Sequence, residues 1–406
     1  MPFELVALLP SAKIEFASPA LGDLDGDGTP EIVVGTSDGW VHAVKANSSQ
    51  GTILWSRNTA SALNAVAPNP AAATIRAAIT IADLDGDGWH EVIVPVGDIL
   101  QVPENGGVVV YSHSGALYSG WPQVTYDREA TGYTAGIAST PAVADLDADG
   151  DLEIITGAFD HRVYAWHHNG DLVKGWPRHV YDTVWSSPAV GDIDDDGLVE
   201  VVIGTDSHAD PYFGSMQGGA VYAFKPDGTV MAGFPRYLNE NVMSTPALAD
   251  LNGDGYLDIV VGGGSYWGGV DGHKVHVLDY HGNSLAGWPA LTGDNVTGSP
   301  AVADLDGDGD LEVVVGSWDK KVYAWHHNGA LVSGWPMAPK QWWLGTTAQQ
   351  HSAVLVDIDG AARPDSRPEV LVSNGWEVSV IDSQGRQLTW DGVGDNPASL
   401  PTYLTS

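Results

Sequence analysis

The chain has 406 residues, of which 52 are acidic and 17 are basic, so its formal net charge is −35. Because proteins bind phosphate groups through basic patches, this balance argues against nucleic acid as a partner. The absence of cysteine excludes disulfide bonds and thiol chemistry within the sequence. No apolar run approaches the ~18 residues that cross a bilayer, and the first residues lack a basic-then-apolar signal pattern, so we expect no membrane span.

A nine-residue acidic segment recurs six times along the chain. Positions 1, 3 and 5 are Asp (once Asn252), position 6 is Gly, position 9 is Asp or Glu, and a Val/Ile-rich run follows. This alternation lets a loop turn three side chains inward around one hard cation, and the glycine permits a sharp turn. In chain order the copies are Asp23–Glu31, Asp83–Glu91, Asp145–Glu153, Asp192–Glu200, Asp250–Asp258 and Asp304–Glu312.

The remaining positions of the segment support a metal loop over a merely acidic turn. Position 2 is always Leu or Ile, as expected for a side chain that points back into the fold. Position 7 holds unrelated residues, which is what a ligand that acts through its backbone carbonyl would produce. An acidic turn alone would not explain why positions 1, 3, 5 and 9 keep oxygen-bearing side chains.

A seventh copy begins at Asp357 and is incomplete. Asp359 stands at position 3, but Ala361 and Ala362 replace the third carboxylate and the glycine. Four extra residues then precede Glu369. We expect weak or no metal binding there.

Each repeat predicts four strands, most clearly in the third copy. A hairpin turn is expected at Asn169-Gly170, because Asn-Gly favours tight turns between strands. The strands expected around this turn and the acidic loop are Ser139–Asp145, Glu153–Gly157, Arg162–Trp166 and Leu172–Pro177.

Four strands in about 50 residues, repeated seven times, predict an all-β fold that is a seven-bladed β-propeller of four-stranded antiparallel blades. We expect residues 1–406 to form a single domain. Residues 1–16, which include the apolar run Phe3–Leu9, would close the ring, unless Arg386–Trp390 supplies the last strand of blade seven; the sequence leaves both open. The predicted blades span about 17–60, 77–125, 138–180, 185–238, 243–291, 297–338 and 350–391.

Two further motifs accompany the strands. Gly-Trp-Pro or Gly-Phe-Pro ends five of the repeats, and we interpret its aromatic residue as packing between adjacent blades. The pairs His167-His168 and His326-His327 stand beside Asn-Gly turns. We interpret them as solvated turn residues rather than metal ligands.

The pattern Asp-x-Asp-x-Asp-Gly-x-x-Asp/Glu, followed by a Val/Ile strand and Gly, resembles the FG-GAP/VCBS repeats and the calcium-binding blades of integrin α-chain propellers. The resemblance covers about residues 17–391. It implies one Ca²⁺ in the loop between the first and second strands of each blade, about six in all. The implied ligands, with position 7 acting through its carbonyl, are Asp23, Asp25, Asp27, Thr29, Glu31, Asp83, Asp85, Asp87, Trp89, Glu91, Asp145, Asp147, Asp149, Asp151, Glu153, Asp192, Asp194, Asp196, Leu198, Glu200, Asp250, Asn252, Asp254, Tyr256, Asp258, Asp304, Asp306, Asp308, Asp310 and Glu312.

The face opposite the metal loops is the candidate ligand surface. Exposed aromatic residues with polar neighbours can stack on sugar rings or anchor a protein partner, although they could equally plug the ends of the blades. The candidates are Tyr212, Tyr266, Trp267, Trp342 and Trp343.

These observations predict an extracellular or cell-surface recognition or adhesion module for a glycan or protein ligand, as a monomeric domain of a larger surface protein. The alternative is a polysaccharide-degrading lyase on the same scaffold. Its acid–base set would come from Arg178, His179 and Tyr181, with Arg128 on the preceding connection. We assign no catalytic residue.

Overall fold

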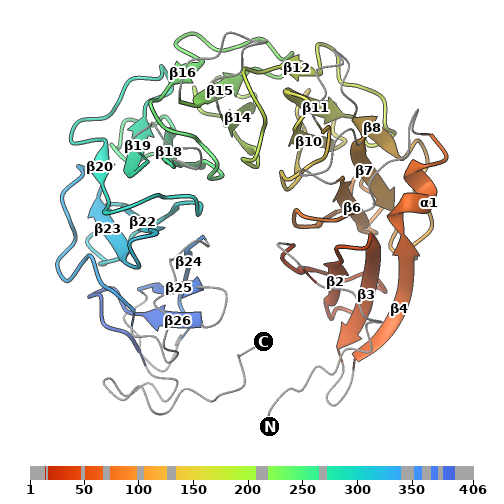
Figure 1. Cartoon of the computed structure of the whole chain (residues 1–406), viewed down its shortest axis with the longest axis horizontal. Helices are drawn as coiled ribbons and strands as arrows, with labels where there is room; N and C mark the ends of the chain where they lie inside the picture. The colour runs from red at the N-terminus through yellow and green to blue at the C-terminus, as the bar shows by residue number, and fades with distance from the viewer. Residues whose placement is uncertain are drawn as a thin grey trace. The chain divides into compact units, whose positions relative to one another are not determined.

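The structure is a computed structural model of the whole chain (Figure 1). It describes residue 14 and residues 17–46, 51–66, 74–97, 105–125, 134–206, 218–264, 272–339, 352–358, 367–373 and 378–388. The statements below concern these residues.

The described residues form an all-β structure of seven antiparallel sheets. Three sheets have four strands each in the first half of the chain. They consist of β1 (Ala20–Gly22), β2 (Glu31–Gly35), β3 (Trp40–Ala46) and β4 (Gly51–Asn58); β5 (Thr80–Ala82), β6 (Glu91–Val96), β7 (Gly106–Tyr111) and β8 (Gln123–Thr125); and β9 (Ala142–Ala144), β10 (Glu153–Ala158), β11 (Arg162–Trp166) and β12 (Arg178–His179).

The later sheets repeat the same order with two shorter members. The fourth and fifth sheets have four strands, and the sixth and seventh have three. Their strands are β13 (Ala189–Gly191), β14 (Glu200–Gly204), β15 (Ala220–Phe224) and β16 (Arg236–Tyr237); β17 (Ala247–Ala249), β18 (Asp258–Gly262), β19 (Lys274–Leu278) and β20 (Ala290–Leu291); β21 (Ala301–Ala303), β22 (Glu312–Gly316) and β23 (Val322–His326); and β24 (Val354–Val356), β25 (Glu369–Ser373) and β26 (Val378–Ile381).

Within every sheet each strand pairs with its neighbour in the sequence, as Figure 1 shows. In the third sheet Glu153 pairs with Ala144, and Ile154 pairs with Trp166. Each sheet is therefore a simple meander in which successive connections alternate between the two ends of the sheet.

The chain divides into two compact units, one mainly residues 1–190 and the other mainly residues 231–406. In the first unit, sheets one and two share a core, and so do sheets two and three. In the second unit, sheets five and six share a core, as do sheets six and seven. The inner strands β6, β7, β10 and β11 are buried on both faces, so most of their residues are apolar and do not alternate with polar ones.

The predicted second and third strands are confirmed, but the predicted fourth strand was placed too early. In the third sheet Leu172 only bridges Trp166, and the strand β12 begins after Pro177. Residues 174 and 175 form a turn before the strand, with Gly175 at φ 98°. Among the fourth strands that the structure describes, β4 of the first sheet is the longest, and it runs into a short helix, α1 (Thr59–Leu63), capped by Asn58.

The closing strand of the seventh sheet stays a prediction. Gln387 bridges Ile381, and the Leu388 N–H donates to the Val380 carbonyl at 2.7 Å. The corresponding bridge in the other sheets belongs to the turn before the fourth strand. The two candidates for that strand, Phe3–Leu9 and the end of Arg386–Trp390, lie outside the described residues. Among the residues described, no helix is long and apolar enough to cross a bilayer.

Candidate metal loops

The six complete acidic segments each join the first and second strands of a sheet. We name them metal loops 1 to 6 in chain order: loop 1 (23–31), loop 2 (83–91), loop 3 (145–153), loop 4 (192–200), loop 5 (250–258) and loop 6 (304–312). Because the following strand begins at position 9, the acidic residue there is already part of the sheet.

The carboxylate at position 1 organises each loop. Its Oδ2 accepts the N–H of the position-6 glycine at 2.8–3.2 Å in all six loops. In five loops its Oδ1 accepts the N–H of position 4 or 5. The position-6 glycines have φ between 83° and 99°, and a Cβ added there would meet nothing within 4 Å. Glycine is therefore required by the backbone conformation, not by space.

The carboxylate at position 9 lies beneath the loop. These six residues are at most 2% exposed. In loops 1, 2, 3, 5 and 6 one of their oxygens accepts the N–H of position 2 at 2.7–3.1 Å. The position-2 side chains are at most 4% exposed, which confirms that they point into the fold.

The predicted ligand side chains come together in the loops. Asp23, Asp25 and Asp27 each offer one oxygen within 4.8 Å of the others, and loop 3 repeats this with its three aspartates. In loop 2 the group is Asp83, Asp85 and Glu91. The position-7 N–H donates to the position-5 carboxylate in loops 1, 2, 3, 5 and 6. Metal ligation by these residues stays a prediction.

The electrostatics of the loops fit a bound cation. Burial raises the pKa of Glu91 to about 7, and the carboxylates of Asp85, Asp87 and Asp83 add to the rise. Burial, with Asp254 and Asp250, likewise raises the pKa of Asp258 to about 7. In loop 1 the buried Oε1 of Glu31 has no hydrogen-bond partner. Buried carboxylates among other carboxylates need a compensating charge, which a divalent cation would supply.

The residue opposite position 9 on the third strand differs among the loops. We call it the third-strand partner. In loop 1 it is Lys45, whose Nζ pairs with Asp25, lies 2.6 Å from Asp27 and lies 3.9 Å from the Glu31 Oε1. The hydrogen bond from Lys45 is the main reason that the pKa of Asp27 is lowered.

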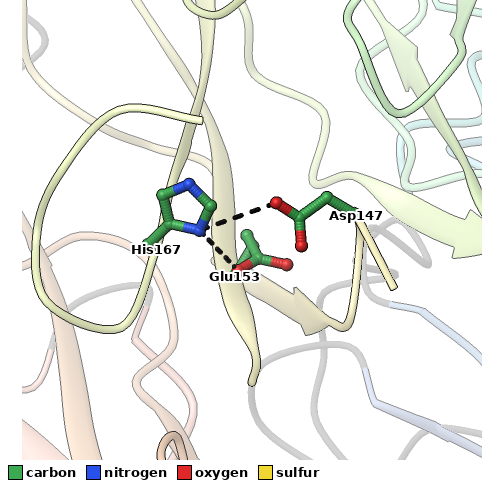
Figure 2. A group of neighbouring side chains, drawn as sticks. All are labelled: Asp147, Glu153 and His167. Atoms are coloured by element: carbon green, nitrogen blue, oxygen red, sulfur yellow. Dashed lines mark hydrogen bonds and ion pairs between the residues drawn. The ribbon is translucent and has the colours of Figure 1, made fainter. Parts of the chain in front are cut away.

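In loops 3 and 6 the third-strand partner is a histidine, as Figure 2 shows for loop 3. The Nδ1 of His167 lies 3.0 Å from the Glu153 Oε1 and 4.0 Å from the Asp147 Oδ2. His326 repeats this against Glu312 at 3.0 Å and Asp306 at 3.8 Å. The interpretation of these residues as solvated turn histidines was wrong, because their rings face the loop carboxylates.

In loops 2, 3, 5 and 6 the residue that follows the third-strand partner contacts the side chain at position 7 of the loop. Asp151 lies 3.3 Å from His168, and Asp310 lies 3.4 Å from His327. In loop 2 Trp89 stacks on His113 with ring centroids 4.3 Å apart, and in loop 5 Tyr256 stacks on Tyr280 at 4.4 Å. Twin histidines occur only in the repeats that have Asp at position 7. This correlation is visible in the sequence and could have predicted the contact between the second histidine and that aspartate.

The seventh copy keeps part of this architecture. The Ile358 N–H donates to the Glu369 Oε2 at 3.1 Å, as position 2 does in the complete loops. Residues 359–366 lie outside the described residues, so weak or absent metal binding there stays a prediction.

In repeats two, three, five and six the Gly-Trp-Pro motif connects a sheet to the turn of the next one, which confirms its interpretation as packing between sheets. The Trp121 Nε1–H donates to the His168 carbonyl at 2.7 Å, and Trp288 donates to His327 at 2.9 Å. Trp176 and Trp335 make the equivalent bonds. A Cβ on Gly120 would lie 1.8 Å from the Asn169 carbonyl oxygen, so no other residue fits there.

The candidate ligand residues Tyr212, Tyr266, Trp267, Trp342 and Trp343 all lie outside the described residues. They remain predictions.

Of the residues proposed for a lyase, the structure describes Arg178, His179 and Tyr181. Arg128 lies outside the described residues. Arg178 donates to the Asp227 carbonyl at 3.0 Å in the following turn. His179 is the next residue of β12, and neighbouring strand residues point to opposite faces of a sheet. The alternative function therefore gains no support from this geometry.

Comparison with known families identifies the repeat. The profile of the FG-GAP-like repeat matches residues 145–203, 250–315 and 304–372, and that of the FG-GAP repeat matches residues 16–53. The chain belongs to the FG-GAP repeat proteins. The matched segments include metal loops 1, 3, 4, 5 and 6.

Several solved structures are similar to this FG-GAP repeat protein at low sequence identity. BBS1N, crystallised in complex with ARL6DN, is 13% identical over 95% of this chain and 96% of its own, with a TM-score of 0.50. A europium-containing methanol dehydrogenase is 12% identical over 89% of this chain and 73% of its own, with a TM-score of 0.53. The WD40 β-propeller domain of Doa1 is 14% identical over 89% and 92%, with a TM-score of 0.45. No curated protein matches the chain.

Proposed function

We propose that the chain is a seven-bladed β-propeller whose metal loops hold about six Ca²⁺ ions, and that it acts outside the cell as a recognition module. The seven sheets would be the blades. Membership of the FG-GAP repeat proteins and the shared cores between consecutive sheets within each unit support this arrangement.

The repeated loop geometry carries the proposal. Six loops fix their position-1 aspartate with backbone N–H groups and bury the position-9 carboxylate under the loop. The burial of the position-9 carboxylates and the raised pKa values of Glu91 and Asp258 support the proposal, because buried carboxylates among other carboxylates favour a bound cation. Ca²⁺ accepts six to eight oxygen ligands in flexible geometry, so it suits loops rich in carboxylates and carbonyls.

The strand order supports a recognition site at the end of the sheets opposite the metal loops. Metal loops join first to second strands, whereas segments 207–217 and 265–271 connect second to third strands, at the other end of their sheets. Residues 340–351 connect the sixth sheet to the seventh. We propose that Tyr212, Tyr266, Trp267, Trp342 and Trp343, which these segments contain, bind a glycan or protein ligand.

The extracellular assignment rests on calcium. Loops of this kind in extracellular modules bind Ca²⁺ at about 10⁻⁴–10⁻³ M, a range that cytosolic calcium would not fill. A chain without cysteine has no disulfide to stiffen it, so bound ions would supply that stiffening.

The metal content of the purified protein tests the proposal. After chelation, dialysis against Ca²⁺ and removal of free ion, elemental analysis should find about six Ca²⁺ per chain. Two or fewer would contradict the assignment of these loops. For the ligand surface, Trp267→Ala and Trp342→Ala should weaken binding in a glycan or protein screen without changing the melting temperature. A large loss of stability would instead place these rings in the core.

A further inference from the structure

Loops 3 and 6 carry a set of groups that the other complete loops lack. In each, a histidine Nδ1 lies 3.0 Å from an oxygen of the buried position-9 glutamate and about 4 Å from the position-3 aspartate (Figure 2). The three groups Asp147, Glu153 and His167 offer one atom each within 4.8 Å, as do Asp306, Glu312 and His326.

The histidine position is built into the sheet and is not an accident of side-chain placement. Glu312 pairs directly with His326 between β22 and β23, and the register Ile154–Trp166 places His167 opposite Glu153. The same register places Ser112 opposite Glu91 and Asp279 opposite Asp258. The third-strand partner is therefore one fixed position in the sheet, and only loops 3 and 6 of the six complete loops have His there.

We propose that loops 3 and 6 bind a divalent transition-metal ion such as Co²⁺, Mn²⁺ or Zn²⁺, with the Nδ1 of His167 or His326 as a nitrogen ligand beside the carboxylates. This inference rests on the proposed function of the loops as cation sites. Imidazole nitrogen suits ions of this class, whereas Ca²⁺ takes oxygen ligands. The four remaining complete loops keep their preference for Ca²⁺.

The measured separations agree with ligands of one ion. Two ligand atoms ~2.1 Å from an ion and at right angles to each other lie roughly 3.0 Å apart, and two on opposite sides lie roughly 4.2 Å apart. The nitrogen-to-glutamate separation of 3.0 Å matches the first arrangement, and separations of 3.8–4.0 Å to the aspartate approach the second. His168 and His327 contact Asp151 and Asp310 and hold the turn against the loop.

Co²⁺ is a suitable probe because its visible absorption reports nitrogen and oxygen ligation. The full chain is stripped with chelator, saturated with Ca²⁺ and titrated with Co²⁺, and bound ions are counted after equilibrium dialysis. We expect about two Co²⁺ per chain in the presence of excess Ca²⁺. The double variant His167→Ala/His326→Ala should bind Co²⁺ at least ~10-fold more weakly, and each single variant should lose one site.

Matched variants separate ligation from folding and from adventitious histidine binding. His113→Ala and His281→Ala remove turn histidines that contact Trp89 and Tyr280, so they should leave both Co²⁺ sites intact. His167→Gln keeps a hydrogen-bond donor for Glu153 and should still lose one site. Ser112→His places an imidazole opposite Glu91 and should add a third site.

The outcomes distinguish this inference from the proposed function. Co²⁺ binding that survives in His167→Ala/His326→Ala would overturn the inference, as would a wild-type protein that holds about six Ca²⁺ but no Co²⁺. In that second case the calcium loops stand and the histidines serve only as hydrogen-bond partners. A protein that binds neither ion would contradict the proposed function itself.

Discussion

At the scale of single residues, the metal loops depend on backbone conformation as much as on charge. Position 6 was predicted to be a turn glycine, and its φ above 80° confirms that the backbone there lies in the left-handed region that favours glycine. Position 4 was not singled out, because Ala148 and Asp195 occupy it in two loops, yet both have positive φ (61° and 56°). A left-handed backbone position cannot be recognised from the sequence when a residue other than glycine occupies it, although the side chain there carries a steric cost of about 1–2 kcal/mol.

Ala148→Gly should therefore stabilise the protein. Relief of the left-handed strain outweighs the added freedom of the unfolded chain, so the free energy of unfolding should rise by about 0.5–1 kcal/mol. Gly150→Ala, at φ 99° in the same loop, is the matched control and should destabilise by at least ~1 kcal/mol. Denaturant unfolding in saturating Ca²⁺ measures both. A destabilised Ala148→Gly variant would show that the Ala148 methyl makes a contact that matters more than strain.

The buried carboxylates predict an unusual pH dependence for the metal-free protein. Burial and neighbouring carboxylates raise the pKa of Glu91 and Asp258 to about 7, above their ordinary values of 4.5 and 3.8. At pH values between the ordinary and the raised pKa, the folded state binds more protons than the unfolded state. The free energy of unfolding therefore falls as pH rises toward and through about 7. In EDTA the melting temperature should rise when pH is lowered from 8 to 6.

Glu91→Gln removes one of these groups and should make that dependence shallower. In Ca²⁺ the dependence should weaken or reverse, because metal binding requires the deprotonated carboxylates. Thermal melts in EDTA at pH 6, 7 and 8 provide the measurement. A melting temperature that falls on acidification would mean that these carboxyls already have a compensating charge.

At the scale of elements, strands that pair locally were predictable and contacts between sheets were not. β10 and β11 were predicted within one residue, because apolar residues mark both strands and the Asn169-Gly170 turn marks the end of β11. The fourth strand was misplaced because Gly175-Trp176-Pro177 reads locally as a strand end. Its actual role is set by the next turn, where Trp176 donates to the Pro226 carbonyl. The histidines of loops 3 and 6 were misread for the same reason.

The Trp bond between sheets should contribute measurably to stability. Trp121→Phe removes the Nε1–H donor and leaves the part-buried His168 carbonyl without this partner, which should cost about 1 kcal/mol. Phe234 fills the equivalent place in the fourth repeat, so the ring itself is accommodated. Trp40→Phe, at a residue 40% exposed, is the control and should change little. Equal melting temperatures for both variants would mean that the bond contributes nothing net.

At the scale of the whole molecule, the sequence repeat was the main basis for predicting the fold. Seven copies of one pattern predicted seven antiparallel sheets, and the described residues contain them. The single closed domain, the occupancy of the loops and the ligand surface remain predictions. Local sequence patterns cannot establish these features, because the features depend on contacts between sheets and on bound ions and partners. The aromatic residues proposed for binding lie in connections whose sequences do not repeat, so no internal comparison constrains them.

The central claim is that calcium holds this chain together. Like charges ~4 Å apart repel by about 1 kcal/mol per pair in water and by more near a protein surface, so metal-free loops strain every sheet. Ions that bind only the folded state stabilise it by mass action. The most direct test is a thermal melt of the full chain in EDTA, then with 1–5 mM Ca²⁺ or Mg²⁺, as an order-of-magnitude range. EDTA should lower the melting temperature by roughly ten degrees or more, Ca²⁺ should restore it, and Mg²⁺ should do so poorly. Identical melts in EDTA and in Ca²⁺ would contradict the claim, because the apolar cores of the sheets would then suffice alone.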